Sequence, residues 1–443
     1  MLSKYAHKMY LKKDLYAVFN NLLLEPLFVN TEEMKKIFSN DIDSFSEEER
    51  YQLYDKCIYI HNKEQDKVAL ETIRNMIESH TRNKITMMYI IPNNNCNLKC
   101  KYCFLGQLNE QPKYMSEETA YNAITKFVEH LKKINADKGQ IIFYGAEPLI
   151  NFDIIKYITV LVEKAKFPID VIMVSNATLL DEEKMNFIKE HNISLGISID
   201  GTKEINDENR IFKGDNNSVY DIVMKKLKEL DNKEIPYGLS ITISEETLDN
   251  LKTFKKWLKD NNFKDINYNP LQYSDKNANW KKYYNRIGKE IFNLNQELFP
   301  LGVNEDRISR KYKSFYNRDF KYSDCGAVGA NQICISPNGD INICHGYWNK
   351  QEQVLGNINN MSFDEIFNTD MYNLWHNNLT INKKKCINCP AIFTCGGGCG
   401  MEAQDLFGKI TDIDLPFCKY TKDVQRRMLL DLYECEEKEN QVN

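Results

Sequence analysis

The chain has little proline and no long apolar segment, and both absences narrow what it can be. Only 11 of its 443 residues are proline, and no apolar run reaches the length of a membrane-spanning helix. Hydrophobic residues make up 42% of the chain and charged residues 27%, which is ordinary for a globular protein. The net charge of −5 offers no basic footprint for nucleic acid. We therefore expect two or three globular domains that bind neither nucleic acid nor a membrane.

A secretory signal is also missing from the N-terminus. Residues 1–8 (MLSKYAHK) are too polar for the apolar core of a signal peptide. We therefore expect a cytoplasmic protein, in which thiols stay reduced. In that compartment, 13 cysteines indicate metal binding rather than disulfides.

Three of these cysteines stand close together on a short segment. Cys96, Cys100 and Cys103 have CxxxCxxC spacing and follow Ile85–Ile91, an apolar, β-branched run that predicts a buried strand. Three thiolates can hold three corners of a four-iron cluster and leave its fourth iron open to another ligand. Structural zinc would need a fourth Cys or His nearby, but none follows before residue 130. The spacing therefore favours an open iron–sulfur cluster over a zinc loop.

From residue 85 onward, strand-like runs alternate with amphipathic helical stretches. The predicted strands are Ile85–Ile91, Gln140–Tyr144, Ile169–Ser175, Ile193–Asp200, Tyr237–Ile243 and Ile266–Pro270. The predicted helices are Glu117–Lys133, Phe152–Lys166, Asp181–His191, Val219–Asn232 and Glu246–Asn261. Strict alternation predicts an α/β fold with a parallel sheet and crossover helices. Six such units, without a seventh and an eighth, predict an open partial barrel.

The cysteine loop resembles the signature of the radical S-adenosylmethionine (radical SAM) enzymes, in which CxxxCxxC is followed by aromatic residues, here Tyr102 and Phe104. The resemblance implies a partial (β/α)6 TIM-like barrel of the radical SAM type. It also implies that the open iron is chelated by the amino and carboxylate groups of S-adenosylmethionine (SAM). One electron then cleaves SAM to a 5′-deoxyadenosyl radical, which abstracts a hydrogen atom from the substrate.

Three further strand ends resemble cofactor-binding motifs of this family. Residues 145–148 (GAEP) resemble the GGEP motif, whose backbone binds the methionine amino group, with alanine where the second glycine is usual. Residues 175–178 resemble the TNG turn and residues 198–201 the SxDG element. Taken alone, each motif is ordinary turn chemistry. The residues that the resemblance assigns to SAM are Tyr102, Gly145, Ala146, Glu147, Asn176, Ser198 and Arg210.

A second cysteine array occupies the C-terminal third of the chain. Its centre, residues 386–399, has CxxCxxxxxCxxxC spacing. The array resembles the seven-cysteine pattern of the SPASM extension, which holds two auxiliary iron–sulfur clusters in one subfamily of radical SAM enzymes. The resemblance assigns four cysteines to the distal cluster: Cys386, Cys389, Cys395 and Cys418. It assigns three to the proximal cluster: Cys325, Cys344 and Cys399.

The resemblance leaves open whether Cys334 is a fourth ligand of the proximal cluster. It lies in Gln332–Ser336, a predicted strand, where a small buried residue is the simpler interpretation. If Cys334 does not bind the proximal cluster, that cluster keeps an open iron that could coordinate a substrate thiolate. A pair of zinc ribbons is the alternative for the whole array. With the first loop, the array implies SAM and three 4Fe–4S clusters, and only Cys57 and Cys435 remain outside them.

Residues 1–84 precede the barrel. They contain possible strands or short apolar segments at Leu11–Phe19 and Cys57–Ile60, helical patterns at Thr31–Phe38 and Ser46–Tyr54, and a further helix after Lys67. This α+β pattern resembles the small winged-helix-like precursor-recognition domain of peptide-modifying radical SAM–SPASM enzymes, in which a leader peptide adds a strand to a sheet edge. A structural N-terminal cap is the alternative. We expect three domains, at residues 1–84, 85–310 and 311–443.

Two activities fit the resemblance. The first is maturation of a ribosomal precursor peptide with a leader sequence, in which hydrogen abstraction leads to a thioether or carbon–carbon crosslink. The second is anaerobic sulfatase maturation, which oxidises Cys or Ser to formylglycine. The 95 residues before the cysteine loop favour the first activity. A non-catalytic electron carrier is a third option. The resemblance also implies an electron donor such as flavodoxin or ferredoxin, whereas no residue is predicted as a catalytic base.

Overall fold

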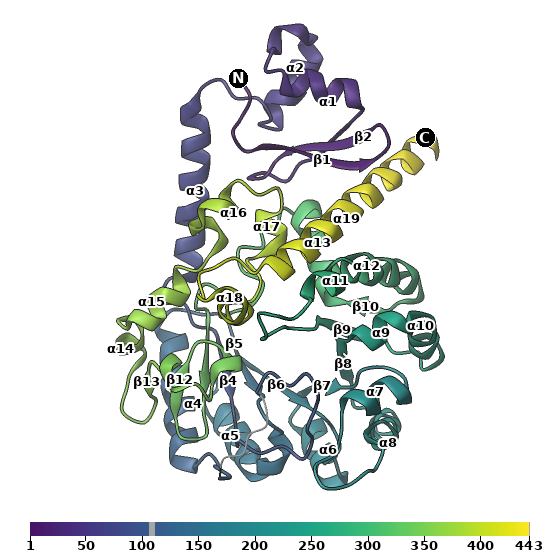
Figure 1. Ribbon diagram of the computed structural model, residues 1–443. Helices are drawn as coiled ribbons and strands as arrows, with labels where there is room; N and C mark the ends of the chain where they lie inside the picture. The colour runs from purple at the N-terminus through teal and green to yellow at the C-terminus, as the bar shows by residue number, and fades with distance from the viewer. Residues whose placement is uncertain (106–110, 443) are drawn as a thin grey trace.

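The N-terminal unit, an α/β sheet and a cysteine-rich C-terminal region make up the computed structural model, which describes residues 1–105 and 111–442. The N-terminal unit lies at the top of Figure 1, and the sheet with its helices lies below it. Helix α3 (Lys63–Thr81) runs from the N-terminal unit toward the sheet (Figure 1). The C-terminal helix α19 (Leu415–Val442) returns to strand β1 (Ala6–Lys12). The two ends of the chain thus meet in one part of the molecule.

The N-terminal unit is a three-stranded antiparallel sheet of order β1-β2-β3 with two short helices. The remaining elements are β2 (Leu15–Asn20), β3 (Leu27–Val29), α1 (Thr31–Phe38) and α2 (Glu47–Asp55). A single strand over Leu11–Phe19 is wrong, because the chain reverses at Asp14, where φ is 56°, and β1 pairs with β2. Cys57–Ile60 is not a strand; Tyr59 makes an isolated bridge to Leu2. The predicted α+β character is confirmed.

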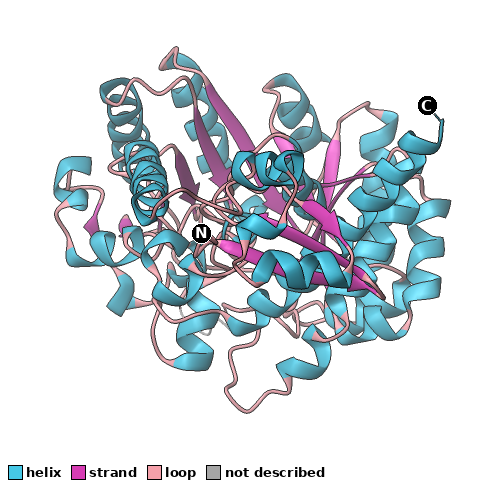
Figure 2. Cartoon of the chain, turned by 90° about the horizontal axis from the view of Figure 1, so that it is seen from above, coloured by secondary structure: helices cyan, strands magenta, loops and turns pink. Residues whose placement is uncertain are grey.

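Six parallel strands form the centre of a ten-stranded sheet of order β10-β9-β8-β7-β6-β5-β4-β11-β12-β13. The six are β4 (Met87–Ile90), β5 (Gly139–Phe143), β6 (Ile169–Ser175), β7 (Ser194–Ser198), β8 (Tyr237–Ile243) and β9 (Asp265–Pro270). Figure 2 shows the strands in the interior and helices around them. The predicted parallel α/β class is confirmed. Because the strands are parallel, their carboxyl ends meet at one edge.

Crossover helices connect these strands and bury one apolar stripe each. They are α4 (Glu117–Lys133), α5 (Phe152–Lys164), α6 (Glu182–Glu190), α7 (Lys203–Asn209), α8 (Val219–Asn232), α9 (Glu245–Asp249) and α10 (Leu251–Asp260). The predicted helix Glu246–Asn261 is two helices, because the backbone of Asn250 leaves the helical region with φ −111° and ψ 30°.

The C-terminal region extends the same sheet. Strand β11 (Gln332–Ile335) pairs in parallel with β4, and β12 (Asp340–Asn342) and β13 (Gly356–Asn357) follow antiparallel. Strand β10 (Asn304–Glu305) adds to the opposite edge. The helices are α11 (Trp280–Tyr284), α12 (Ile287–Leu298), α13 (Asp306–Tyr316), α14 (Phe363–Phe367), α15 (Asp370–His376), α16 (Lys384–Ile387), α17 (Ile392–Cys395) and α18 (Gly400–Phe407). The cysteine array is therefore attached directly to the barrel.

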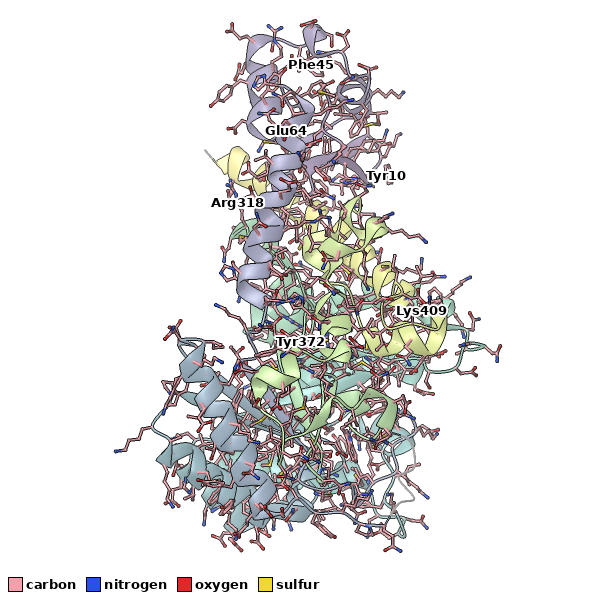
Figure 3. All side chains as sticks on the ribbon, turned by 90° about the vertical axis from the view of Figure 1, so that its left-hand side faces the viewer. Tyr10, Phe45, Glu64, Arg318, Tyr372 and Lys409 are labelled. Carbon is pink, nitrogen blue, oxygen red and sulfur yellow. The ribbon has the colours of Figure 1, made fainter. Side chains whose placement is uncertain are left out.

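The N-terminal sheet packs against the C-terminal region through an apolar face. Phe19 of β2 lies edge-on to Phe315 of α13, with ring centroids 5.9 Å apart. Below this face, the hydroxyl of Tyr372 accepts a hydrogen bond from the backbone N–H of Asn83, just past the end of α3, at 2.8 Å (Figure 3). The division into residues 1–84, 85–310 and 311–443 stays a proposal, and its second boundary falls inside α13. Within the described chain, no helix is both long and apolar enough to cross a bilayer.

Candidate functional site

The cysteine loop after β4 is fastened to the edge where the parallel strands end. The side-chain amide of Asn93 donates to the carbonyl of Glu147 at 2.9 Å, and the N–H of Glu147 donates to the carbonyl of Asn95 at 3.0 Å. On its other side the loop pairs with residues 209–213, because the N–H groups of Lys99 and Lys101 donate to backbone carbonyls there at 2.7 and 2.9 Å. The loop is thus held at both borders by directional bonds.

The three thiols of this loop differ in burial. Cys96 and Cys100 are half-buried and Cys103 is exposed. The N–H of Leu98 donates to Sγ of Cys96 at 3.4 Å, and the amide of Asn176 lies 4.0 Å from the same sulfur. Burial raises the pKa of Cys96 to about 12, with the charges of Cys100 and Cys103 adding to the shift. These N–H donors can stabilise a thiolate bound to iron.

Glu147 joins two strand ends rather than standing free. Its carboxylate accepts hydrogen bonds from Oγ of Ser175 at 2.7 Å, from the N–H of Asn176 at 2.9 Å and from the N–H of Leu149 at 3.1 Å. The residue is 1% exposed, and burial raises the pKa of its carboxyl group. Its carboxylate therefore positions the β5 and β6 ends, and its backbone positions the cysteine loop.

The turns at these strand ends adopt the backbone that their glycine-rich counterparts would favour. Gly145 has φ of 114°, and a Cβ there would lie 2.7 Å from a methyl group of Ile91. Ala146 needs no left-handed backbone, so alanine replaces glycine there without strain. Ala177, where the TNG turn has glycine, has φ of 60°. The side chain of Asn176 donates to Oδ1 of Asn97 at 2.9 Å, which links this turn to the cysteine loop.

Tyr102 and Arg210 meet on a residue that sequence reasoning did not select. Nε and Nη2 of Arg210 donate to the carboxylate of Asp200 at 3.0 and 3.1 Å, and the Tyr102 hydroxyl donates to the same group. Asp200 is 0% exposed. Burial alone would lower the pKa of Arg210, but the Asp200 charge raises it far above its usual value. The only signal for Asp200 was an Asp-Gly pair after a strand. Ser198 lies half-buried at the end of β7, in register with Ser240.

Aromatic rings lie between the first cysteine loop and the C-terminal array. His345, next to Cys344, stacks on Tyr89 with centroids 4.3 Å apart and lies edge-on to Tyr144 at 4.8 Å. Burial raises the pKa of Tyr144 to about 12, and the charges of Cys103 and Cys344 both add to that shift. Tyr144 therefore lies near a cysteine of each group. The sequence carries no periodic signal for this cluster.

The structure brings Cys325, Cys344 and Cys399 together. Burial raises the pKa of Cys399, and the charges of Cys344 and Cys325 raise it further. The N–H of Gly346 donates to Sγ of Cys344 at 3.3 Å. The N–H of Cys399 donates to the carboxylate of Asp414 at 2.8 Å. Three thiols from three separate segments thus lie close enough for their charges to interact.

The structure also gathers the four cysteines assigned to the distal cluster. Burial raises the pKa of Cys386 to about 11, and the charges of Cys395 and Cys389 act in the same direction. Cys395 ends α17 and Cys418 lies in the first turn of α19, where its interaction with Cys395 raises its pKa. In the described residues, no three Cys, His, Asp or Glu side chains are placed to hold a single metal ion.

Glycines make room for the backbone around this array. Gly396, Gly397 and Gly398 have φ of 69°, 94° and 72°. A Cβ on Gly396 would lie 2.3 Å from the backbone nitrogen of Asp324, and one on Gly398 would lie 2.6 Å from Oδ2 of Asp414. Side chains are therefore excluded where the chain winds between the two cysteine sets, and backbone N–H groups can approach sulfur atoms there.

Cys334 lies apart from the other cysteines in character. It is 0% exposed in β11 and packs in an apolar cluster with Ile91, Leu105 and Trp348. Burial raises the pKa of its thiol well above the usual value, with Cys344 adding to the shift. Cys334 is thus close enough to Cys344 to interact with it, but its surroundings are those of a core residue.

Comparison with known proteins agrees with this geometry. Residues 90–258 match the radical SAM superfamily, and residues 325–390 match the SPASM iron–sulfur cluster-binding domain. The chain is a radical SAM enzyme with a SPASM domain. As a member of that superfamily it uses SAM and carries iron–sulfur clusters.

Named relatives of this radical SAM enzyme perform different reactions. It is 25% identical over 449 residues to the radical SAM cyclopropyl synthase TigE of Paramaledivibacter caminithermalis, across 94% of this chain and 89% of TigE. It is 23% identical over 353 residues to the cysteine-type anaerobic sulfatase-maturating enzyme of Clostridium novyi, across 76% of this chain and 93% of that enzyme. Membership of the superfamily therefore leaves the particular reaction open.

Solved structures share its fold. The structure of anSMEcpe with bound AdoMet superposes with a TM-score of 0.69 and 20% identity, across 79% of this chain and 98% of anSMEcpe. The structure of Streptococcus suis SuiB bound to S-adenosylmethionine superposes with a TM-score of 0.54 and 15% identity, across 90% of this chain and 96% of SuiB. The radical SAM fold with a C-terminal extension is common to all three.

Proposed function

We propose that Cys96, Cys100 and Cys103 hold an open 4Fe–4S cluster whose free iron binds SAM, and that the enzyme modifies a ribosomal precursor peptide. The observation that carries this proposal is the convergence of these thiols with three strand-end turns at one edge of the sheet. When bound, SAM and the cluster supply a 5′-deoxyadenosyl radical that abstracts a hydrogen atom from the peptide. Bond formation between this carbon radical and a second group of the peptide would then release a proton and an electron, which an auxiliary cluster would accept, and would give a thioether or carbon–carbon crosslink.

The residues around the loop have distinct parts in this proposal. Backbone groups of Gly145 and Ala146 line the turn that would bind the methionine amino group. Ser198, Asn176 and Arg210 frame the adjacent strand ends, where the ribose and carboxylate of SAM would lie. Arg210 keeps Nη1 available, since its other nitrogens donate to Asp200. Tyr102 holds the loop over this ion pair. No residue is assigned as a catalytic base.

The second part of the proposal concerns the auxiliary clusters. Cys386, Cys389, Cys395 and Cys418 would hold the distal 4Fe–4S cluster, which makes three clusters in all. The proximal cluster would have Cys325, Cys344 and Cys399 as ligands. The apolar surroundings of Cys334 support a proximal iron that is open to a substrate thiolate.

The N-terminal unit supports a peptide substrate with a leader. Strand β1 forms one edge of its sheet, where Arg426 of α19 donates to the carbonyl of Leu11 at 3.0 Å, and α19 also contacts β3 through Tyr433, whose ring lies edge-on to Phe28. Strand β3 forms the other edge, where a leader peptide could add as a fourth strand. SuiB, which covers 90% of this chain, has also been solved bound to precursor peptide SuiA. TigE is a cyclopropyl synthase, so other carbon–carbon bond formation is compatible with this architecture.

Sulfatase maturation is the second candidate function. The fold of anSMEcpe superposes more closely than that of SuiB, with TM-scores of 0.69 and 0.54. However, anSMEcpe covers only 79% of this chain. The extra N-terminal unit, with its own sheet, favours the peptide maturase.

An external reductant is part of the same proposal. A flavodoxin or ferredoxin would deliver single electrons. A cavity of about 650 Å³ lies beside α16 and is lined in part by Lys383, Lys384 and Lys385. This lysine-rich surface next to Cys386 suits an acidic electron carrier.

Anaerobic incubation of the reconstituted enzyme with SAM and dithionite tests the reaction class. We expect 5′-deoxyadenosine, detected by liquid chromatography, and its absence from a fully iron-loaded enzyme would refute the proposal. Short peptides encoded beside this gene, and a sulfatase-derived peptide with Cys or Ser, then separate the two functions by mass. Loss of two hydrogens on the precursor supports crosslinking, and formylglycine on the sulfatase peptide supports the alternative.

A further inference from the structure

A lysine lies buried beside the distal cysteine set. Lys311, in α13, is 4% exposed, and its Nζ donates to the carbonyl of Thr394 at 2.9 Å and to Oγ1 of Thr421 at 3.5 Å. Thr394 directly precedes Cys395, and Thr421 follows Cys418 by three residues. The ammonium group is therefore held by the segments that carry two of the distal cysteines.

Two arginines on α13 are paired with carboxylates, but Lys311 is not. Arg307 pairs with Asp324 at 3.2 Å, and Arg310 pairs with Asp306 at 2.9 Å. Across residues 1–105 and 111–442, no carboxylate oxygen comes within 4.0 Å of the Lys311 ammonium. In the part of the chain that the structure describes, the Lys311 ammonium on this buried face of α13 thus has no carboxylate in direct contact with it.

The protein alone compensates this charge only in part. The ammonium lies over the rings of Phe417 and Tyr420, at 5.2 and 5.8 Å from their centroids, and such contacts are weak attractions. Burial lowers the pKa of Lys311, while the charges of Asp324 and Cys395 act in the opposite direction. Burying an ammonium is costly unless negative charge lies close to it.

We propose that Lys311 is a buried counter-charge of the distal iron–sulfur cluster and raises its reduction potential. This inference rests on the distal ligand set proposed above. Four thiolates give that site negative charge, and a one-electron reduction adds one more negative charge without taking up a proton. A cation in a buried setting stabilises the more negative form, because screening by water is weak there.

A redox titration followed by electron paramagnetic resonance tests the role of Lys311. Dithionite reduces the reconstituted enzyme in a Cys96→Ala, Cys100→Ala, Cys103→Ala background, so that only auxiliary clusters contribute. We expect Lys311→Met to lower the reduction equilibrium constant of the distal cluster by about tenfold, which is 59 mV for a one-electron couple. Lys311→Arg keeps the charge, and Lys313→Met removes an exposed charge from the same helix. Both should leave the potential nearly unchanged.

Iron content separates the possible failures. An unchanged potential in an iron-replete Lys311→Met enzyme overturns the inference. If Lys311→Met and Lys311→Gln both lose the distal cluster, retention of iron by Lys311→Arg supports the charge requirement, and loss of iron in that variant overturns it. Failure of the proposed ligand set has a different signature: Cys395→Ala would then keep the distal signal and its iron.

Discussion

The first cysteine loop and the C-terminal cysteine array hold their thiols by different means. The loop depends on side-chain and backbone hydrogen bonds from strand ends, and Cys103 is exposed. The array depends on three consecutive glycines of positive φ, on helix ends and on buried charges. From this difference we expect the loop to exchange a ligand at its cluster and the distal set of the array to keep its cluster fully ligated. Substitutions in the two regions test this difference, and they are given in order of decreasing expected effect.

Removal of the loop thiols should have the largest effect on chemistry. Replacement of Cys96, Cys100 and Cys103 by alanine should lower 5′-deoxyadenosine formation more than about 100-fold, because the iron that binds SAM is lost. Iron held by the array should remain, and chemical iron analysis measures it. Replacement of the four distal cysteines is the matched control, and we expect it to remove iron while SAM cleavage persists. Equal loss of cleavage in both variants would contradict the separate roles.

Breaking the ion pair beneath the loop should cost stability. Arg210→Gln leaves Asp200 as a buried, unpaired charge and should lower the free energy of unfolding by about 3 kcal/mol. Denaturant unfolding measures this value. Lys203→Gln is the control, because it breaks an exposed ion pair with Asp221 on a nearby helix. It should change the free energy of unfolding little. If the double variant Asp200→Asn, Arg210→Gln is no more stable than Arg210→Gln, the buried-charge explanation is wrong.

A single methyl group should disturb the array. Gly396→Ala places a Cβ against backbone that cannot move aside and should lower the free energy of unfolding by about 2 kcal/mol, with loss of iron. Gly408→Ala also has positive φ, but nothing lies within 4 Å of its Cβ, so only backbone strain of about 1 kcal/mol applies. Thermal unfolding and iron analysis compare the two. Equal effects would show that crowding around Gly396 is unimportant.

Cys334→Ala should have the smallest effect. Its thiol lies in an apolar cluster, so we expect a loss of about 1 kcal/mol in stability and an unchanged iron content. Iron per chain and the spectrum of the proximal cluster measure the outcome. Loss of about one cluster's iron would instead make Cys334 a ligand.

Local sequence patterns predicted most helices and strands of the barrel, but few of the turns and side-chain contacts that connect them. Helices α4 and α8 and strand β8 have the predicted bounds, because apolar periodicity and capping residues act over a few positions. The hairpin of β1 and β2 was missed, since its turn at residues 13–14 contains no glycine. Motif spacing led to Tyr102 and Arg210 but did not single out Asp200, which bonds Tyr102 from 98 positions away in the sequence and Arg210 from 10 positions away. Such pairings depend on topology and leave no local pattern.

The hydrogen bonds of Asn21 limit how early during synthesis the N-terminal unit can complete its packing. This asparagine, which follows β2, is 0% exposed, and its amide donates to the carbonyls of Ile387 and Cys389 at 3.0 and 2.9 Å. The partners of Asn21 are thus synthesised more than 360 residues after it. The N-terminal sheet therefore leaves the ribosome before α13 and residues 387–389, and the apolar side of Phe19 stays uncovered at least until Phe315 is synthesised. The N-terminal unit can complete its packing only after residues 387–389 have been made.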